Sequence, residues 1–147
     1  MGLDFKLYEV TTYNDVEIRK EHTIEEVAYF SNSTAMIITN WFYRINGTHL
    51  KDTFDEMNHY VTVTGDKLYD IIKALNKVIN TDTAKKDLLA LHYFPAVYPV
   101  DDYVSSVEMF SEKYYNNLNE LYNTLKKIMP NDTFLNQERL FFYNISW

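Results

Sequence analysis

Four side chains between residues 52 and 59 are of the types that bind divalent cations: Asp52, Asp55, Glu56 and His59. On a helix Asp55 and His59 would share a face, because residues four apart lie one turn apart. Carboxylate oxygens and imidazole nitrogens are both common metal ligands. The same composition is typical of a solvated acidic loop, which is the alternative. Whether the cluster binds a metal therefore stays open, and we predict no cofactor from it.

Acid–base catalysis needs titratable groups that converge, and the chain offers adjacent pairs instead. The pairs are Asp101–Asp102 and Glu25–Glu26, and neighbouring residues of a strand point to opposite faces. His92, between Leu91 and Tyr93, is expected to be a hydrogen-bonded histidine of a strand. With no cysteine and only three glycines, the chain has neither a thiol nucleophile nor a phosphate-binding glycine loop. We therefore expect no catalytic residues.

Tyrosine is the remaining signal, with 13 in a chain of 147 residues. Tyrosine is frequent at interfaces because it brings contact area and a polar tip at low entropic cost. Core packing of a ring-rich domain is the alternative and accounts for most of these rings. The proline-bearing segment 95–103 nevertheless combines apolar, aromatic and acidic side chains. With two tyrosines of the following helix, it predicts a partner-binding surface of Val97, Tyr98, Asp101, Asp102, Tyr103, Tyr115 and Tyr122.

Charge and hydropathy narrow the class of partner. The chain has 14 basic and 21 acidic residues, a formal net charge of −7. Domains that bind a nucleic-acid duplex normally carry a basic excess, so we expect no direct nucleic-acid binding. No apolar run approaches the roughly 20 residues of a membrane helix, and the first residues lack a secretory signal pattern. We therefore expect a cytoplasmic protein with no membrane association.

Hydrophobic periodicity predicts an α+β fold. Alternation indicates strands at 3–10, 16–19, 60–63, 88–94 and 140–147, and helical spacing indicates helices at 35–45, 66–79 and 106–129. A strand is the alternative at 35–45. Because strands lie at both ends with helices between them, we expect a single domain, 1–147. Its small antiparallel or mixed sheet would be covered by two or three helices.

The long helix near 106–129 bears on the oligomeric state. Its apolar residues recur at steps of three and four, and Ser105 with Glu108 has the pattern of a capping box that would begin it. The apolar stripe can pack on the chain's own sheet, which predicts a monomer. It can also pack on a second copy, which predicts a homodimer. The dimer contact would use the neighbouring row, Tyr115, Tyr122 and Met129.

Short motifs are spread over nearly the whole chain: Met1-Gly2-Leu3-Asp4, Tyr29-Phe30, Trp41-Phe42, Tyr60-Val61, Asp101-Asp102-Tyr103, and Tyr143 with Ser146-Trp147. In these motifs the chain resembles a family of small, uncharacterised proteins of bacteriophages and prophages. The resemblance implies a phage origin and the host cytoplasm as location, and it implies no activity. Ser31-Asn32 replaces a basic pair of that family, and Thr39 replaces a histidine. An anion-binding role of those family residues therefore does not transfer.

These observations predict a small phage-type accessory protein that acts by binding. Its partner would be a host protein, such as a defence factor, that it inhibits or modulates. One alternative is a protein that binds or sequesters a nucleotide-like small molecule between aromatic side chains. An enzyme of unknown class is a further alternative.

Overall fold

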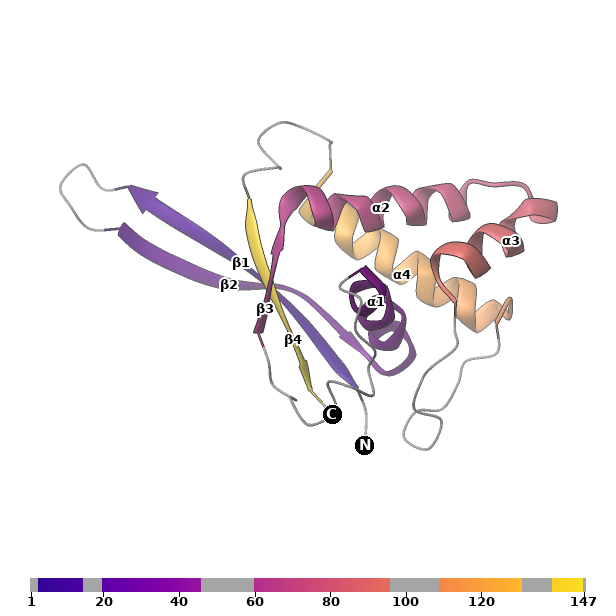
Figure 1. Cartoon of the computed structure of the whole chain (residues 1–147), viewed down its shortest axis with the longest axis horizontal. Coiled ribbons are helices and arrows are strands. Elements are labelled where there is room, and N and C mark those ends of the chain that lie inside the picture. Colours follow the sequence, from indigo (N-terminus) through magenta and orange to yellow (C-terminus); the bar gives the residue numbers. More distant parts are fainter. Residues whose placement is uncertain (1–2, 15–19, 46–59, 96–108, 131–138, 147) are drawn as a thin grey trace.

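The computed structural model describes residues 3–14, 20–45, 60–95, 109–130 and 139–146. These residues form a four-stranded sheet and four helices (Figure 1). In chain order the elements are β1 (Asp4–Asn14), β2 (Lys20–Ser31), α1 (Asn32–Ile45), β3 (Tyr60–Thr64), α2 (Gly65–Ile79), α3 (Thr83–Tyr93), α4 (Glu112–Ile128) and β4 (Leu140–Ser146). The α+β fold, with N- and C-terminal strands and helices between them, is confirmed.

The sheet is antiparallel throughout, in the order β2-β1-β4-β3. β4 lies between β1 and β3, as the rings on both sides of its alternating pattern predict. Its pairing with β1 runs from Asp4 opposite Ser146 to Val10 opposite Leu140. The first and last of the described strands therefore form the middle of the sheet.

Alternation places one row of each central strand against the helices. The fully buried members of these rows are Phe5 and Leu7 on β1 and Phe141 and Tyr143 on β4. The ring of Phe5 stacks on Tyr143 at 5.1 Å and on Phe42 of α1 at 5.9 Å between centroids. Because large rings bury much apolar area, this stack anchors the helical layer on the sheet.

The helix α4 begins at Glu112, so the predicted helix is too long at its N-terminal end. Phe110 lies in a turn with φ 65°, which a right-handed helix does not allow. The hydroxyl oxygen of Ser111 accepts a hydrogen bond of 3.2 Å from the backbone N–H of Tyr114 and caps the first turn. The predicted capping box at 105–108 lies outside the described residues. With 17 residues, α4 is about 25 Å long.

α3 is a helix, and the prediction of a strand at 88–94 is wrong. Leu88 and Leu91 of this helix are 69% and 48% exposed, so its apolar residues do not mark one buried face. Pro95, a stop signal for a strand, equally follows a helix, because proline disfavours helical geometry in the residue before it. His92 is therefore an exposed residue near the end of a helix.

β2 is a strand of 12 residues that the hydrophobic pattern does not predict. The weak strand at 16–19 lies outside the described residues. β1 and β2 pair from Asp4–Ser31 to Asn14–Lys20, and the end of the pair at Asn14 and Lys20 projects beyond the helices as a two-stranded arm (Figure 1). Thr23 and Glu25 in this arm are exposed. Since residues 23–26 of β2 are all exposed, this part of the strand carries no clean alternation.

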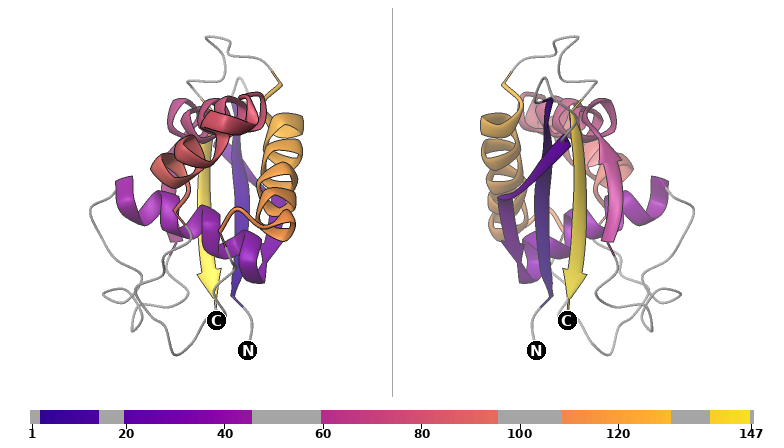
Figure 2. Two further views of the ribbon diagram at one scale, coloured as in Figure 1. Left: turned by 90° about the vertical axis from the view of Figure 1, so that its right-hand side faces the viewer. Right: turned by 90° about the vertical axis from the view of Figure 1, so that its left-hand side faces the viewer.

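All four described helices lie on one face of the sheet (Figure 2). Antiparallel sheets often have one face on the core and the other in water, and the second face is then polar. In this protein the second face carries aromatic side chains.

Candidate functional site

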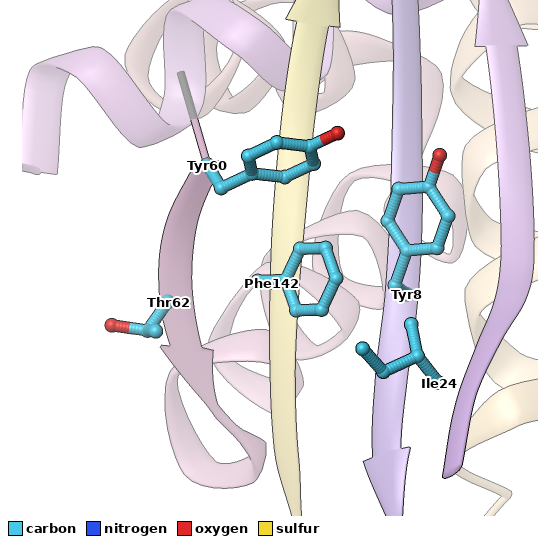
Figure 3. A pocket seen from close by; sticks show the side chains of 5 residues that line it. All are labelled: Tyr8, Ile24, Tyr60, Thr62 and Phe142. Carbon is cyan, nitrogen blue, oxygen red and sulfur yellow. The ribbon is translucent and has the colours of Figure 1, made fainter. Parts of the chain in front are cut away.

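The face of the sheet opposite the helices carries a group of rings around Phe142 of β4 (Figure 3). The ring of Phe142 stacks on that of Tyr8 at 4.8 Å and meets the ring of Tyr60 edge-on at 5.3 Å. Ile24 of β2 and Thr62 of β3 complete the group. We call these five residues the open-face cluster. Stacked and edge-on rings attract each other, so the three rings form one continuous surface.

The two-residue period of the strands positions the centre of this cluster. Phe141 and Tyr143 are buried toward the helices, so Phe142 between them points to the open face. Tyr8 lies directly opposite Phe142, and Phe142 lies opposite Thr62. Side chains directly opposite one another on adjacent strands are in contact distance, which brings residues from three strands together.

A β-bulge brings Ile24 to the same face. The pairing of β1 with β2 shifts register between Leu7 and Tyr8, and Ile24 then lies opposite Val10. Val10 shares its face with Tyr8, two residues before it. Without the shift, Ile24 would lie on the other face of the sheet, because one residue of slip reverses every side chain.

Two large apolar side chains of the open-face cluster are mostly exposed. Tyr60 is 65% and Ile24 59% exposed. The cluster lines a shallow hollow of about 470 Å³, a size typical of ligand sites. None of its five side chains carries a carboxylate, imidazole or amine. The hollow therefore supplies apolar and aromatic contacts and the hydroxyl groups of Tyr8, Tyr60 and Thr62.

Polar and charged side chains lie beside the cluster. Glu26 lies opposite Tyr8. The hydroxyl of Tyr29 donates a hydrogen bond of 2.7 Å to Asp4, and the ammonium of Lys6 lies 6.0 Å from the centroid of the Tyr29 ring. The hydrogen bond to the Asp4 carboxylate is the main cause that raises the pKa of Tyr29 above its ordinary value. An apolar centre with a polar rim is the usual anatomy of a protein interface.

Most of the predicted partner-binding residues lie outside the described part of the chain: Val97, Tyr98, Asp101, Asp102 and Tyr103. Tyr115 and Tyr122 are described, and both are half-buried on α4. The hydroxyl of Tyr115 donates to the Asp87 carboxylate on α3, and that of Tyr122 donates to Asn76 on α2 at 3.2 Å. Burial, and then Asp87, raises the pKa of Tyr115. Both tyrosines thus join helices within the chain, and their role in binding a partner stays a prediction.

The structure also bears on the predicted dimer row and on the predicted metal ligands. Met129, the third member of the predicted dimer row, is fully buried in the chain's own core and does not contribute to such a surface. The predicted metal ligands Asp52, Asp55, Glu56 and His59 lie outside the described residues. Within the described ranges, no group of three or more potential ligands is placed to hold a metal ion.

Comparisons with known proteins find no match to this chain. No protein-family model, no curated protein and no solved structure is significantly similar to it. The resemblance to phage proteins therefore stays a prediction. Among the described helices, none combines the length and the apolarity needed to cross a lipid bilayer.

The residues of the open-face cluster are not among the predicted site residues, although the sequence contains a signal for them. The predicted strand at 140–147 has rings on both sides of its alternating pattern, with Phe142 between Phe141 and Tyr143. Rings on both faces of a strand need a cover on both faces if all of them belong to a core. Two or three helices on one side of a small sheet leave one set of rings uncovered.

Proposed function

We propose that the protein acts by binding another protein, and that the open-face cluster is the centre of its binding surface. The observation that carries this proposal is the exposure of Tyr60 and Ile24 around the stacked pair of Tyr8 and Phe142. Contiguous apolar surface of this kind on a soluble domain is typical of interaction sites. Tyrosine is also among the residues that contribute most to binding energy at such sites.

The charges of the chain favour a partner that is basic around an apolar patch. The net charge is −7, and Glu26 of β2 lies opposite Tyr8 of β1. Complementary charge speeds encounter and disfavours wrong partners. A second copy of the chain would bring two charges of −7 together, which opposes association. A phosphorylated ligand is disfavoured in this hollow, because none of its lining side chains is cationic.

The resemblance to phage proteins supports a host protein as this partner. Binding over the partner's apolar patch would inhibit or modulate it, as expected for a factor directed against host defence. A basic protein that acts on nucleic acid fits the charge argument best, since it presents the positive surface that an acidic domain attracts.

A pair of matched variants tests the proposal. Tyr60→Ser removes a ring of the open-face cluster that is 65% exposed, and Leu88→Ser removes an equally exposed side chain, at 69%, from α3. Each variant is used as bait in lysate of a bacterial host, and the captured proteins are quantified by mass spectrometry. We expect a stoichiometric basic partner with the unaltered chain and with Leu88→Ser. Loss of a central aromatic side chain typically costs about 2 kcal/mol or more, so capture by Tyr60→Ser falls about thirtyfold.

Three results would overturn the proposal. The first is a partner that Tyr60→Ser captures as well as the unaltered chain does, since binding then lies elsewhere. The second is the absence of any stoichiometric partner from hosts with intact defence systems. The third is a homodimer of the purified chain that Tyr60→Ser dissociates in light scattering, because the occupant of the open face is then a second copy.

A further inference from the structure

A second hollow lies in the helical layer, and its charge is opposite to that of the chain. It is bounded by α1, α2 and the end of α3 and has a volume of about 440 Å³. Trp41 and Tyr93 contribute rings to it, and α2 contributes the ammonium groups of Lys67, Lys73 and Lys77. We call this hollow the lysine groove. None of its lining residues belongs to the open-face cluster.

The lysine groove has more positive than negative charge, although Asp66 beside it interacts electrostatically with Lys67. Asp70 is the one carboxylate among its described lining residues, and it pairs with Lys73 at 3.2 Å. Within the described part of the chain, neither Lys67 nor Lys77 forms an ion pair. Arg44 lines an adjoining hollow of about 260 Å³. In a chain with a net charge of −7, this local excess of positive charge attracts an anion.

The wall of the groove formed by α1 is fixed to the end of α3. The guanidinium of Arg44 donates to the backbone oxygens of Tyr93 and His92, at 3.1 and 3.2 Å. A cation at this position also interacts favourably with the C-terminal end of the helix dipole. The ring of Trp41 stacks on Phe94 at 5.3 Å. These contacts hold the rings of the groove in place before a ligand arrives, which lowers the entropic cost of binding.

Ring and cation lie next to each other in the groove. Lys73 and Lys77 are four residues apart on α2 and therefore lie on one face of that helix. The ammonium nitrogen of Lys77 is 5.9 Å from the centroid of the Tyr93 ring. Ammonium groups bind phosphate oxygens as point charges, and aromatic side chains stack on flat heterocycles. The groove thus has a contact for the phosphate of a nucleotide and, beside it, a contact for the base.

We propose that the lysine groove binds a small phosphorylated compound with a flat ring, of the size of a mononucleotide. The phosphate groups lie against Lys73 and Lys77, and the flat ring lies against Tyr93 and Trp41. A volume of about 440 Å³ is within the range of small-molecule sites. The site is independent of the proposed function, because the two surfaces lie on different layers of the fold and share no residue.

Isothermal titration calorimetry of the unaltered chain tests this proposal with three probes: ADP, pyrophosphate and adenosine. We expect saturable binding of ADP at least tenfold tighter than binding of either other probe, since only ADP uses both the rings and the cations. Lys77→Gln should weaken ADP binding more than tenfold, because it removes a charge-assisted hydrogen bond. Lys86→Gln is the matched control. Its ammonium lies 4.7 Å from the Tyr115 ring, outside the groove, and its loss should leave the affinity unchanged.

Several results would overturn the proposal. They are the absence of ADP binding at millimolar concentration, pyrophosphate binding as tight as ADP binding, and equal loss of affinity in both lysine variants. Equal loss of ADP affinity in both variants would show that ADP is attracted by the overall positive charge of the surface and not bound at a specific site. Trp41 supplies a second readout, since it is one of two tryptophans and becomes the single indole in Trp147→Phe. ADP should change its fluorescence, and calorimetry of the unaltered chain decides the question if that variant does not fold.

Discussion

Arg139, the residue before β4, joins the sheet to two helices. Its guanidinium donates to the Glu9 carboxylate of β1, with Nε at 3.0 Å and Nη2 at 2.6 Å from the two oxygens. Nη1 donates at 2.7 Å to the backbone oxygen of Ile128 at the end of α4. The backbone oxygen of Arg139 accepts a bond of 2.9 Å from Gly65 at the start of α2. We therefore predict that the side chain of Arg139 contributes strongly to stability.

The expected cost of Arg139→Met follows from the burial of the pair. The side chains of Arg139 and Glu9 are 28% and 20% exposed. An exposed ion pair contributes up to about 1 kcal/mol, whereas loss of one partner of a buried pair costs about 3–5 kcal/mol. The cost of losing one partner of a pair that is mostly buried lies between these two values. We therefore expect the free energy of unfolding to fall by about 2–3 kcal/mol. Glu25 lies directly opposite Glu9, and their repulsion, which Arg139 offsets, adds to the loss.

A double-mutant cycle with Glu9→Gln separates the ion pair from the packing of the arginine stem, which methionine largely keeps. Urea denaturation of the four proteins measures the free energies. We expect the double variant to lose about 1–2 kcal/mol less than the sum of the single variants. The exposed pair of Asp70 and Lys73 is the control, at 57% and 55% exposure. Its cycle should show a coupling of about 0.3 kcal/mol.

A coupling between Glu9 and Arg139 no larger than that of the exposed control pair would contradict this prediction. Burial of the pair would then have no energetic consequence. A large loss of stability in Arg139→Met without coupling would assign the effect to the Ile128 contact at the end of α4 instead.

Two further predictions concern polar groups of the helices. Thr39 is fully buried on α1, and its hydroxyl has no hydrogen-bond partner among the described residues. The isosteric change Thr39→Val should therefore raise the free energy of unfolding by about 1 kcal/mol, measured as a higher urea midpoint with an unchanged slope. The pKa of Tyr115 is raised by burial and by Asp87, so the folded state holds this proton more tightly than the unfolded state does. The unaltered chain should therefore have a larger free energy of unfolding than Tyr115→Phe at pH values below the unfolded pKa of about 10, and this difference should decrease as the pH rises above that value. Urea denaturation of both proteins below and above pH ~10 measures the difference.

Elements were predictable where one side of the element meets the core. In α2 the residues at helical spacing, among them Leu68, Leu75 and Val78, are all buried, and the pattern is therefore strong. β2 and α3 lack such a pattern for a physical reason. β2 projects with β1 beyond the helices, and Leu88 of α3 is exposed. Hydrophobic periodicity arises because one side of an element is buried. Elements that bury little on one side therefore have weak periodicity in the sequence.

The open-face cluster could not be derived from local pattern, because which face of a sheet is covered is a property of the whole fold. Phe142 and Tyr143 are neighbours of similar chemistry, yet one faces the hollow and the other is fully buried. The position of Ile24 depends in addition on a one-residue bulge, whose effect on the facing of side chains appears only in the paired strands.

The edges of the sheet decide how a partner meets the open face. β2 is an edge strand with adjacent exposed carboxylates, Glu25 and Glu26, and a bulge, which are features that oppose the addition of a further strand. The other edge, β3, has only five residues, and a short edge strand offers little backbone for pairing. Backbone pairing at either edge is therefore disfavoured, while the described elements leave the rings of Tyr8, Tyr60 and Phe142 uncovered on the open face. A partner that approaches this sheet gains most by packing side chains on its face. Substitutions of side chains in the open-face cluster, and not changes that affect backbone pairing at the edge strands, should therefore control affinity.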